Sequence, residues 1–231
     1  MVLPSIIPSE KHPAVQLKAI LNFIEPYKSF VYKKARWADS KTEIEILIEP
    51  RATGRVICSG CGKASPGYDR LPTQRFKFVP LWQIAVYFMY AMRRVDCPTC
   101  GVKVEHVPWC DGKNQLTTTY RWFLVGWAKR LSWKGVAEAF GTTWQNVFCS
   151  VKHAVSWGLE HRSLEGVESI GVDEVQWQKG HKYLTLVYQI DDGSKRLLRI
   201  GKNRTTKTVL RFFQMLGKER SGKLKFVCSD M

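Results

Sequence analysis

The sequence predicts a multidomain α+β protein. Three features carry this prediction: two Cys-x-x-Cys pairs in the first half, a helix-turn-helix pattern in the middle, and alternating strand-like segments from Glu168 onward. The 231 residues, 45% of them hydrophobic, suffice for one large domain or two to three small ones. We expect a zinc-binding domain over residues 1–112, a helical domain over 113–165 and a mixed α/β domain over 166–231.

The chain is strongly basic. It has 36 Lys and Arg residues against 20 Asp and Glu residues, a formal charge of +16 and a pI near 9.7. This charge favours polyanionic partners, nucleic acid first and an anionic membrane surface second. The longest apolar stretch, residues 79–92, contains Gln83 and is too short to cross a bilayer, and the proline-broken N-terminus lacks the pattern of a secretory signal. We therefore expect a cytoplasmic, nucleoid-associated protein that binds DNA and no membrane.

The first domain is expected to contain one helix and several strands. A helix is predicted near "AVQLKAILNFIE" (residues 14–25) and a strand near "TEIEILIE" (42–49). The segment "RFKFVPLWQIAVYFMYAMRRVD" (75–96) is strand-like and is expected to carry the second cysteine pair back to the first.

Four cysteines have the spacing of a metal site. Cys58 and Cys61 in "CSGCG" and Cys97 and Cys100 in "CPTCG" form two Cys-x-x-Cys pairs, each followed by glycine. Two such pairs complete a tetrahedron around zinc, and the glycines allow the tight turns that follow each pair. The sequence therefore predicts a zinc ribbon over about residues 55–110 with a structural Zn²⁺ ion. The alternatives are two disulfides or four buried thiols.

Three further cysteines stand alone. Cys110, Cys149 and Cys228 lie outside the paired motifs, and we expect each to be a small buried hydrophobic residue.

The middle of the chain predicts three helices. "TTTYRWFLVGWAKR" (117–130) begins with a threonine cap, and "LSWKGVAEAFGTTWQNVFCSVKHAVSWG" (131–158) reads as a helix, a turn at Gly141 and a second helix capped by Thr142 or Thr143. The expected apolar stripe comprises Leu131, Val136, Ala137, Phe140, Val147, Phe148, Val151, Ala154 and Val155.

A small residue, a turn glycine and an apolar anchor are arranged here as in DNA-binding helix-turn-helix units. The candidate DNA-contacting residues are Thr143, Trp144, Gln145, Asn146 and Lys152. Gln and Asn can pair with adenine edges, and Lys with phosphate. The alternative is an ordinary helical hairpin with a polar outer face.

The last segment predicts the order strand, strand, strand, helix, strand. The strands are expected in 169–180, 181–193, 194–202 and 223–231, and the helix in 205–217. This order would bring the first and fourth strands side by side, so that Asp173 and Asp230 could approach each other and hold divalent metals for phosphoryl transfer. Glu174 would point to the opposite face and is a poor substitute.

These motifs, in this order, resemble the bacterial insertion-sequence transposases of the ISL-three (ISL3) group. The resemblance rests on the two cysteine pairs with "YDRLP" between them, the helix-turn-helix, "IGVDEVQWQKGHKYLTLVYQID", "GKNRTTKTVLRFFQMLG" and "VCSDM". It implies that residues 166–231 are the first part of a DDE catalytic domain with an RNase H-like fold, and that Asp173 and Asp230 are its first two ligands for Mg²⁺ or Mn²⁺.

The resemblance also implies a function. Such a transposase binds terminal inverted repeats, cleaves and joins strands at target DNA, and acts as a homo-oligomer. The family pattern continues beyond "DM" with a tryptophan, a further strand, helices and a late glutamate, so we expect this sequence to be cut inside that motif and to bind DNA without catalysis. The alternatives are a truncated DNA-binding module or transposition inhibitor, and a zinc-ribbon regulator unrelated to transposition.

Overall fold

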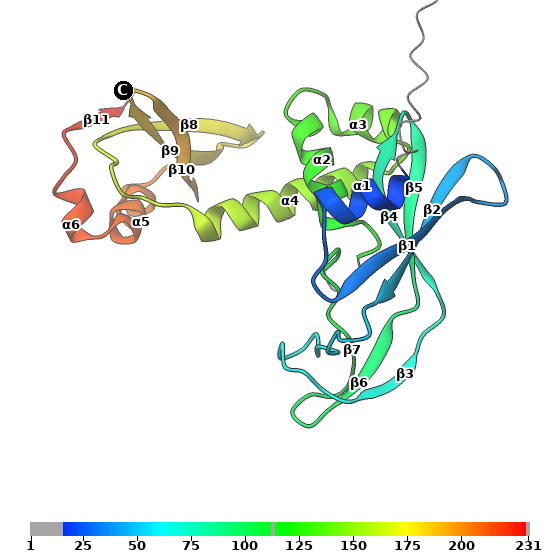
Figure 1. Ribbon diagram of the computed structural model, residues 1–231. Helices are drawn as coiled ribbons and strands as arrows, with labels where there is room; N and C mark the ends of the chain where they lie inside the picture. Colours follow the sequence, from blue (N-terminus) through cyan, green and yellow to red (C-terminus); the bar gives the residue numbers. More distant parts are fainter. Residues whose placement is uncertain (1–15, 112–113, 230–231) are drawn as a thin grey trace, which may run out of the picture. The chain divides into compact units, whose positions relative to one another are not determined.

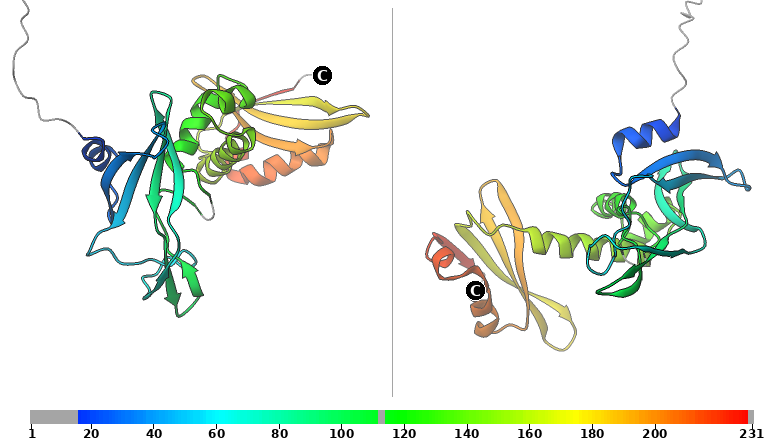
Figure 2. Two further views of the ribbon diagram at one scale, coloured as in Figure 1. Left: turned by 90° about the vertical axis from the view of Figure 1, so that its right-hand side faces the viewer. Right: turned by 60° about the horizontal axis from the view of Figure 1, so that its bottom comes forward.

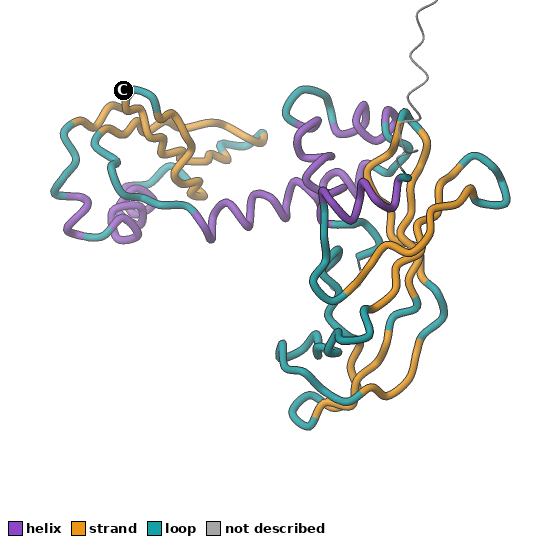
Figure 3. Tube along the Cα trace, in the orientation of Figure 1, coloured by secondary structure: helices purple, strands orange, loops and turns teal. Residues whose placement is uncertain are grey.

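A computed structural model describes residues 16–111 and 114–229 (Figure 1). The chain divides into two compact units, Met1–Gly158 and Leu159–Met231. The first begins with a β-rich part followed by helices, and the second is mixed (Figure 3). Each unit has its own core.

A four-stranded sheet forms the largest core of the first unit. Its order is β1-β2-β5-β4, with β2 and β5 parallel and the other neighbours antiparallel. The strands are β1 (Phe30–Trp37), β2 (Glu43–Pro50), β4 (Gln74–Leu81) and β5 (Ile84–Tyr90). Buried residues alternate along β5 as the strand period requires. The strand predicted near residues 42–49 is confirmed, because β2 covers Glu43–Pro50.

Aromatic side chains fill this core. Trp109 is buried, and four ring centroids lie 4.9–6.0 Å from its own: Tyr27, Phe30, Phe76 and Tyr90. Rings at these separations make favourable edge contacts in addition to the area they bury. This core is separate from the cluster that contains the four paired cysteines.

Helix α1 (Leu17–Ile24) lies against β1 (Figure 2). The Asn22 amide donates to the Tyr32 carbonyl at 3.2 Å and accepts from the Tyr32 N–H at 3.4 Å. It therefore satisfies both backbone groups of this residue of β1. The predicted N-terminal helix is present and begins at Leu17, while residues 14 and 15 of the predicted segment lie outside the described part.

A separate three-stranded sheet carries the cysteines. Its order is β3-β6-β7, formed by β3 (Gly67–Arg70), β6 (Arg93–Cys97) and β7 (Gly101–Val104). The segment 75–96 is strand-rich as predicted, but only its last strand belongs to this sheet, because β4 and β5 pack into the aromatic core.

Three helices follow these sheets: α2 (Thr118–Ala128), α3 (Trp133–Ala139) and α4 (Trp144–His161), of which α4 extends three residues beyond the first unit. Thr117 and Ser132 cap α2 and α3 by accepting the N–H groups of Tyr120 and Gly135. The three predicted helices are confirmed.

The second unit is a four-stranded sheet of order β10-β9-β8-β11. Its elements are β8 (Ser169–Gln178), β9 (Lys182–Asp191), β10 (Ser194–Lys202), α5 (Thr206–Leu216), the short α6 (Lys218–Ser221) and β11 (Phe226–Ser229). The first three strands are joined by tight turns, and β11 returns parallel to β8 after the helices. The predicted neighbourhood of the first and fourth strands is therefore confirmed.

Helix α5 covers one face of this sheet (Figure 2). Phe212 and Leu216 pack with Ile170, Val187 and Leu198 in its core. On the other face and along β11, several large apolar side chains are exposed, among them Trp177, Ile200, Phe226 and Val227. In the described residues, no helix combines the length and hydropathy that a membrane span requires.

Candidate functional site

The four paired cysteines converge as predicted. Their Sγ atoms all lie within 4.8 Å of one another, and those of Cys61 and Cys97 are 3.6 Å apart. Zinc–sulfur bonds of about 2.3 Å give S···S distances of roughly 3.8 Å in a tetrahedron. The donor set therefore fits a four-coordinate metal ion such as zinc.

The glycines after each pair have the predicted role. Gly62 and Gly101 have φ angles of +71° and +69°, which glycine adopts without strain. In the first turn, the Gly60 N–H donates to Cys58 Sγ at 3.4 Å. Each pair thus directs two sulfurs to the same point.

The protein environment changes the acidity of two of these thiols. Hydrogen bonds from Ser65 and from the amides of Thr99 and Cys100 lower the pKa of Cys97 to about 6. A hydrogen bond with Cys61 and burial raise the pKa of Cys100 to about 12. A bound cation favours deprotonation of all four thiols because the thiolate is the ligand form.

This part of the chain has little apolar core. Around the cysteines, only Val95 is a fully buried aliphatic residue and Val56 packs beside it, within the described residues. Small domains with so few buried side chains commonly need a metal or disulfides for stability. A structural metal would supply that stability here.

A buried carboxylate joins the cysteine sheet to the aromatic core. Glu105 pairs across a β-bridge with Cys58, accepts a hydrogen bond from Tyr90 at 2.7 Å and binds the Arg93 side chain. Sequence reasoning missed this residue, because one charged residue after an alternating strand gives no sign of burial.

The segment 131–158 folds as the predicted helix, turn and second helix. Gly141 has a φ of +56°, and the Thr142 N–H donates to the Ala137 carbonyl at 2.9 Å. Thr143 caps α4 by accepting the Asn146 N–H at 3.2 Å. The two helices share a buried cluster with α2, formed by Leu116, Tyr120, Leu124, Val136, Ala137 and Val147.

Part of the predicted apolar stripe is wrong. Leu131, Phe148 and Val155 are 44%, 41% and 56% exposed, and Leu131 lies before the first residue of α3. Three helices alone bury a narrow stripe, and the wider apolar face stays exposed beside Trp122, Trp133 and Trp157.

The candidate DNA-contacting residues lie near the start of α4. Thr143, Trp144, Gln145 and Lys152 are exposed. Asn146 differs, because its side chain is half-buried and its Nδ2 donates to Thr142 Oγ1 at 3.0 Å. The Asn146 side chain therefore points toward the turn.

The three isolated cysteines differ in burial. Cys110 is buried, and burial raises the pKa of its thiol to about 12. Cys149 on α4 and Cys228 on β11 are exposed, so the prediction that both are buried is wrong. Cys149 lies off the buried stripe of α4, and every residue of β11 is exposed.

Asp173 lies on β8, on the sheet face opposite α5. Its ladder partner is Leu186, whereas the flanking pairs Val172–Val187 and Glu174–Thr185 contain the buried residues of β9. The Asp173 carboxylate is exposed, and its Oδ1 accepts the Glu174 N–H at 2.7 Å. Glu174 is on the α5 side of the sheet, where its Oε2 lies 3.9 Å from Arg204 Nε. It therefore lies on the face opposite Asp173, as predicted.

The parallel pairing of β11 ends beside Asp173. Ser229, the last described residue, pairs with Val172. The predicted second carboxylate, Asp230, lies outside the described residues.

Comparison with known proteins finds similar transposases. The family model of ISL3-type DDE transposases, described as "Transposase", matches residues 170–231. The chain is 28% identical over 191 residues to the transposase for insertion sequence element IS1557 from Mycobacterium tuberculosis, covering 79% of this chain and 41% of that protein. It is 22% identical over 216 residues to the transposase for IS1001 from Bordetella parapertussis, covering 93% and 52%.

The chain is similar to the ISL3-type insertion-sequence transposases. The resemblance predicted from its motifs is therefore confirmed. The chain spans about half the length of the curated transposases it matches. No solved structure matches it. The part that matches the ISL3 transposase model begins at Ile170 on β8, so it includes Asp173 and nearly all of the parallel β8–β11 pairing.

Proposed function

We propose that this chain forms the DNA-recognition part and the first catalytic strands of an insertion-sequence transposase. The cysteine sheet, as a zinc ribbon, and the helix-turn-helix bind the terminal inverted repeats. Residues 166–231 are the start of an RNase H-like DDE domain that acts on the bound DNA ends and target DNA. The relatives that carry this proposal are named as transposases.

One observation carries the catalytic part of the proposal. The residues that directly precede Asp173 and Asp230 in the sequence, Val172 and Ser229, are partners in a parallel ladder. Neighbouring parallel strands run in the same direction, so we infer that the positions that follow a ladder pair lie side by side, as the carboxylates of a shared metal site must. Both positions fall within the matched family region.

The donor chemistry at Asp173 suits a hard divalent cation. Its carboxylate is exposed, and the Glu174 N–H already orients one oxygen. Bound Mg²⁺ or Mn²⁺ would supply activation of an attacking oxygen and stabilisation of the leaving oxygen in phosphoryl transfer. The role proposed for Asp173 and Asp230 is to hold those ions.

The exposed start of α4 is the proposed reading surface. Gln145 is the candidate for base contact, Trp144 and Thr143 lie beside it, and Lys152 contacts phosphate. Asn146 is proposed to contact DNA only at the edge of this surface, since its amide is already bonded to Thr142.

The DNA-binding proposal is tested by comparing a duplex that carries an element end with a scrambled duplex. The Gln145→Ala variant should lose affinity for the end sequence and retain affinity for the scrambled one, whereas Lys152→Ala should weaken both and reduce the salt dependence. Ser156→Ala, an exposed change about three turns further along α4, is the control. An equal loss on both duplexes for Gln145→Ala would reject direct readout.

The catalytic proposal is tested by nicking assays with Mg²⁺. Binding of end duplexes without cutting would favour the alternative role of a DNA-binding module or transposition inhibitor. Nicking that is lost in Asp173→Asn would support the proposed role of Asp173, and nicking that this variant retains would contradict it. Absence of any preference for element ends would favour an unrelated zinc-ribbon regulator.

A further inference from the structure

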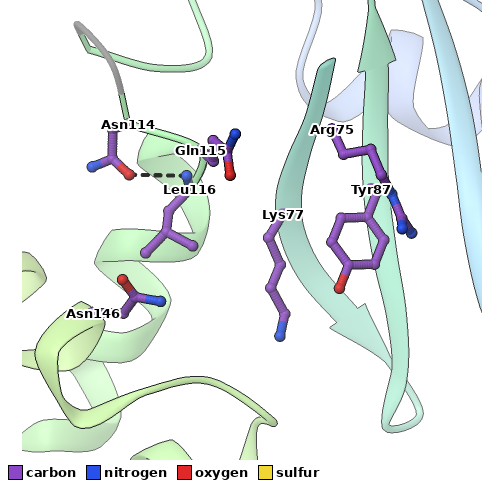
Figure 4. Close-up of a pocket in the computed structure, with 7 residues that line it drawn as sticks. All are labelled: Arg75, Lys77, Tyr87, Asn114, Gln115, Leu116 and Asn146. Atoms are coloured by element: carbon purple, nitrogen blue, oxygen red, sulfur yellow. Dashed lines mark hydrogen bonds between the residues drawn. The ribbon is translucent and has the colours of Figure 1, made fainter. Parts of the chain in front are cut away.

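A polar cavity lies between the four-stranded sheet and the helix-turn-helix. Its volume is about 560 Å³. Figure 4 shows Arg75, Lys77 and Tyr87 on the strand side and Asn146 with the segment before α2 on the other side. Among the described residues, its lining has two cations and no carboxylate; the remaining members are Tyr87, Asn114, Gln115, Leu116 and Asn146.

Backbone pairing fixes both walls of the cavity. The Lys77 N–H donates to the Gln115 carbonyl at 2.7 Å, and the Thr117 N–H donates to the Lys77 carbonyl at 2.9 Å. Asn114 Oδ1 accepts the Leu116 N–H at 2.9 Å. The segment leading to α2 therefore continues the edge of β4, so the cavity is a fixed feature of the first unit.

Lys77 is a half-buried cation. Its Nζ donates to the Gly141 carbonyl in the turn of the helix-turn-helix, and desolvation lowers its pKa. Within the described residues it forms no ion pair with a carboxylate, although the charge of Glu43 partly offsets the effect of desolvation on its pKa. A partly desolvated ammonium group gains strongly from an incoming anion.

Arg75 adds a second, oriented cation. Its guanidinium pairs with Glu43 and lies 4.0 Å from the centroid of the Tyr87 ring. This contact holds the plane of the guanidinium group in one orientation, in which its N–H groups can donate to the oxygens of a phosphate. Glu43 neutralises part of this charge but does not line the cavity.

We propose that this cavity binds a phosphate group of the DNA strand that α4 engages. Asn146 lines the cavity from the third residue of α4, next to Gln145, so a strand crossing the start of this helix reaches the cavity mouth. The inference rests on the proposed DNA-binding function. It adds the sheet residues Arg75 and Lys77 to the contact surface of the helix-turn-helix.

The test is the salt dependence of DNA binding. Each lost phosphate contact should reduce the magnitude of the slope of log K against log salt by about 0.9. The Arg75→Met variant should show this reduction and should weaken binding to end and scrambled duplexes by the same factor. Arg36→Met is the matched control, because Arg36 lies on the same sheet and pairs with Glu45 as Arg75 pairs with Glu43, but does not line this cavity.

A second pair of variants separates contact from folding. Lys77→Met should reduce the slope in the same way, whereas Lys77→Arg, which keeps the charge, should retain it. Thermal unfolding by circular dichroism reports whether each variant folds. Slopes equal to the wild-type value in folded Arg75→Met and Lys77→Met would overturn this inference and leave the proposed function intact.

Inorganic phosphate distinguishes the source of the anion. If phosphate stabilises the wild type but not Arg75→Met, while their DNA slopes agree, the cavity binds a free phosphate and the DNA assignment is overturned. A wild-type chain that binds no DNA would instead overturn the proposed function, and this inference with it.

Discussion

Arg93 binds Glu105 through two hydrogen bonds, from Nε at 2.9 Å and from Nη2 at 2.7 Å. The Glu105 side chain is 1% exposed and also accepts the Arg93 backbone N–H at 2.6 Å. Burial and the hydrogen bond to Glu105 raise the pKa of Tyr90. One carboxylate therefore holds β5, β6 and the residues after β7 together.

Replacing Glu105 should destabilise the first unit strongly. Glu105→Gln leaves the half-buried Arg93 cation without its partner, which costs about 3–5 kcal/mol of unfolding free energy. Denaturant unfolding measures this loss. The control is Glu49→Gln, which removes an exposed pair with Lys33 and should cost less than about 1 kcal/mol. Equal losses in the two variants would contradict the buried role of Glu105.

Removal of one cysteine ligand should abolish metal binding. We expect the purified chain to hold one zinc ion, measured by elemental analysis, and Cys97→Ser to hold none, because three sulfurs cannot complete the site. Cys149→Ser, at an exposed cysteine outside the cluster, should keep the ion. Retention of zinc by Cys97→Ser would show that the cluster is not the binding site.

A side chain at Gly141 should strain the turn between α3 and α4. A Cβ added at this position would meet no heavy atom closer than 3.9 Å, so the cost of Gly141→Ala comes from the φ of +56° and should be about 1–2 kcal/mol. Gly126→Ala inside α2 meets no neighbour and should stabilise the protein by about 0.5–1 kcal/mol. In thermal unfolding, the melting temperature should fall in Gly141→Ala and rise in Gly126→Ala.

Gly201 allows α5 to approach β10. A Cβ at this position would clash with Thr208 Cγ2, so Gly201→Ala should destabilise the second unit by about 1–3 kcal/mol. Thr208→Ser removes that methyl group and keeps the hydroxyl that donates to the Lys202 carbonyl. A double-mutant cycle should show recovery in the combined variant. Additive losses would mean that the two residues do not interact.

Local patterns predicted much of this structure. The spacing of Cys58 with Cys61 and of Cys97 with Cys100 predicted the cluster. Such ligand spacing is a local property of the sequence, so it can be recognised without knowledge of the fold. Strand order predicted the pairing of β11 with β8, since a meander followed by a helix leaves that edge open.

Long-range packing accounts for what the sequence did not predict. The separate core around Trp109 depends on residues far apart in the chain, and the exposure of Phe148 depends on how many layers cover α4. Asn146 has the residue type of a base reader, but its contact with Thr142 is determined by the cap geometry. Such features follow from tertiary contacts and not from periodicity.

The parallel pairing of β11 has a kinetic consequence. The hairpins β8–β9 and β9–β10 join neighbouring segments, so little chain entropy opposes their formation. The pairing of Phe226 with Ser169 closes a loop that contains two strands and two helices, and contacts of such high sequence separation form slowly. We therefore expect the edge beside Asp173 to be the last part of the second unit to assemble, after its hairpins and α5 have formed a folding nucleus.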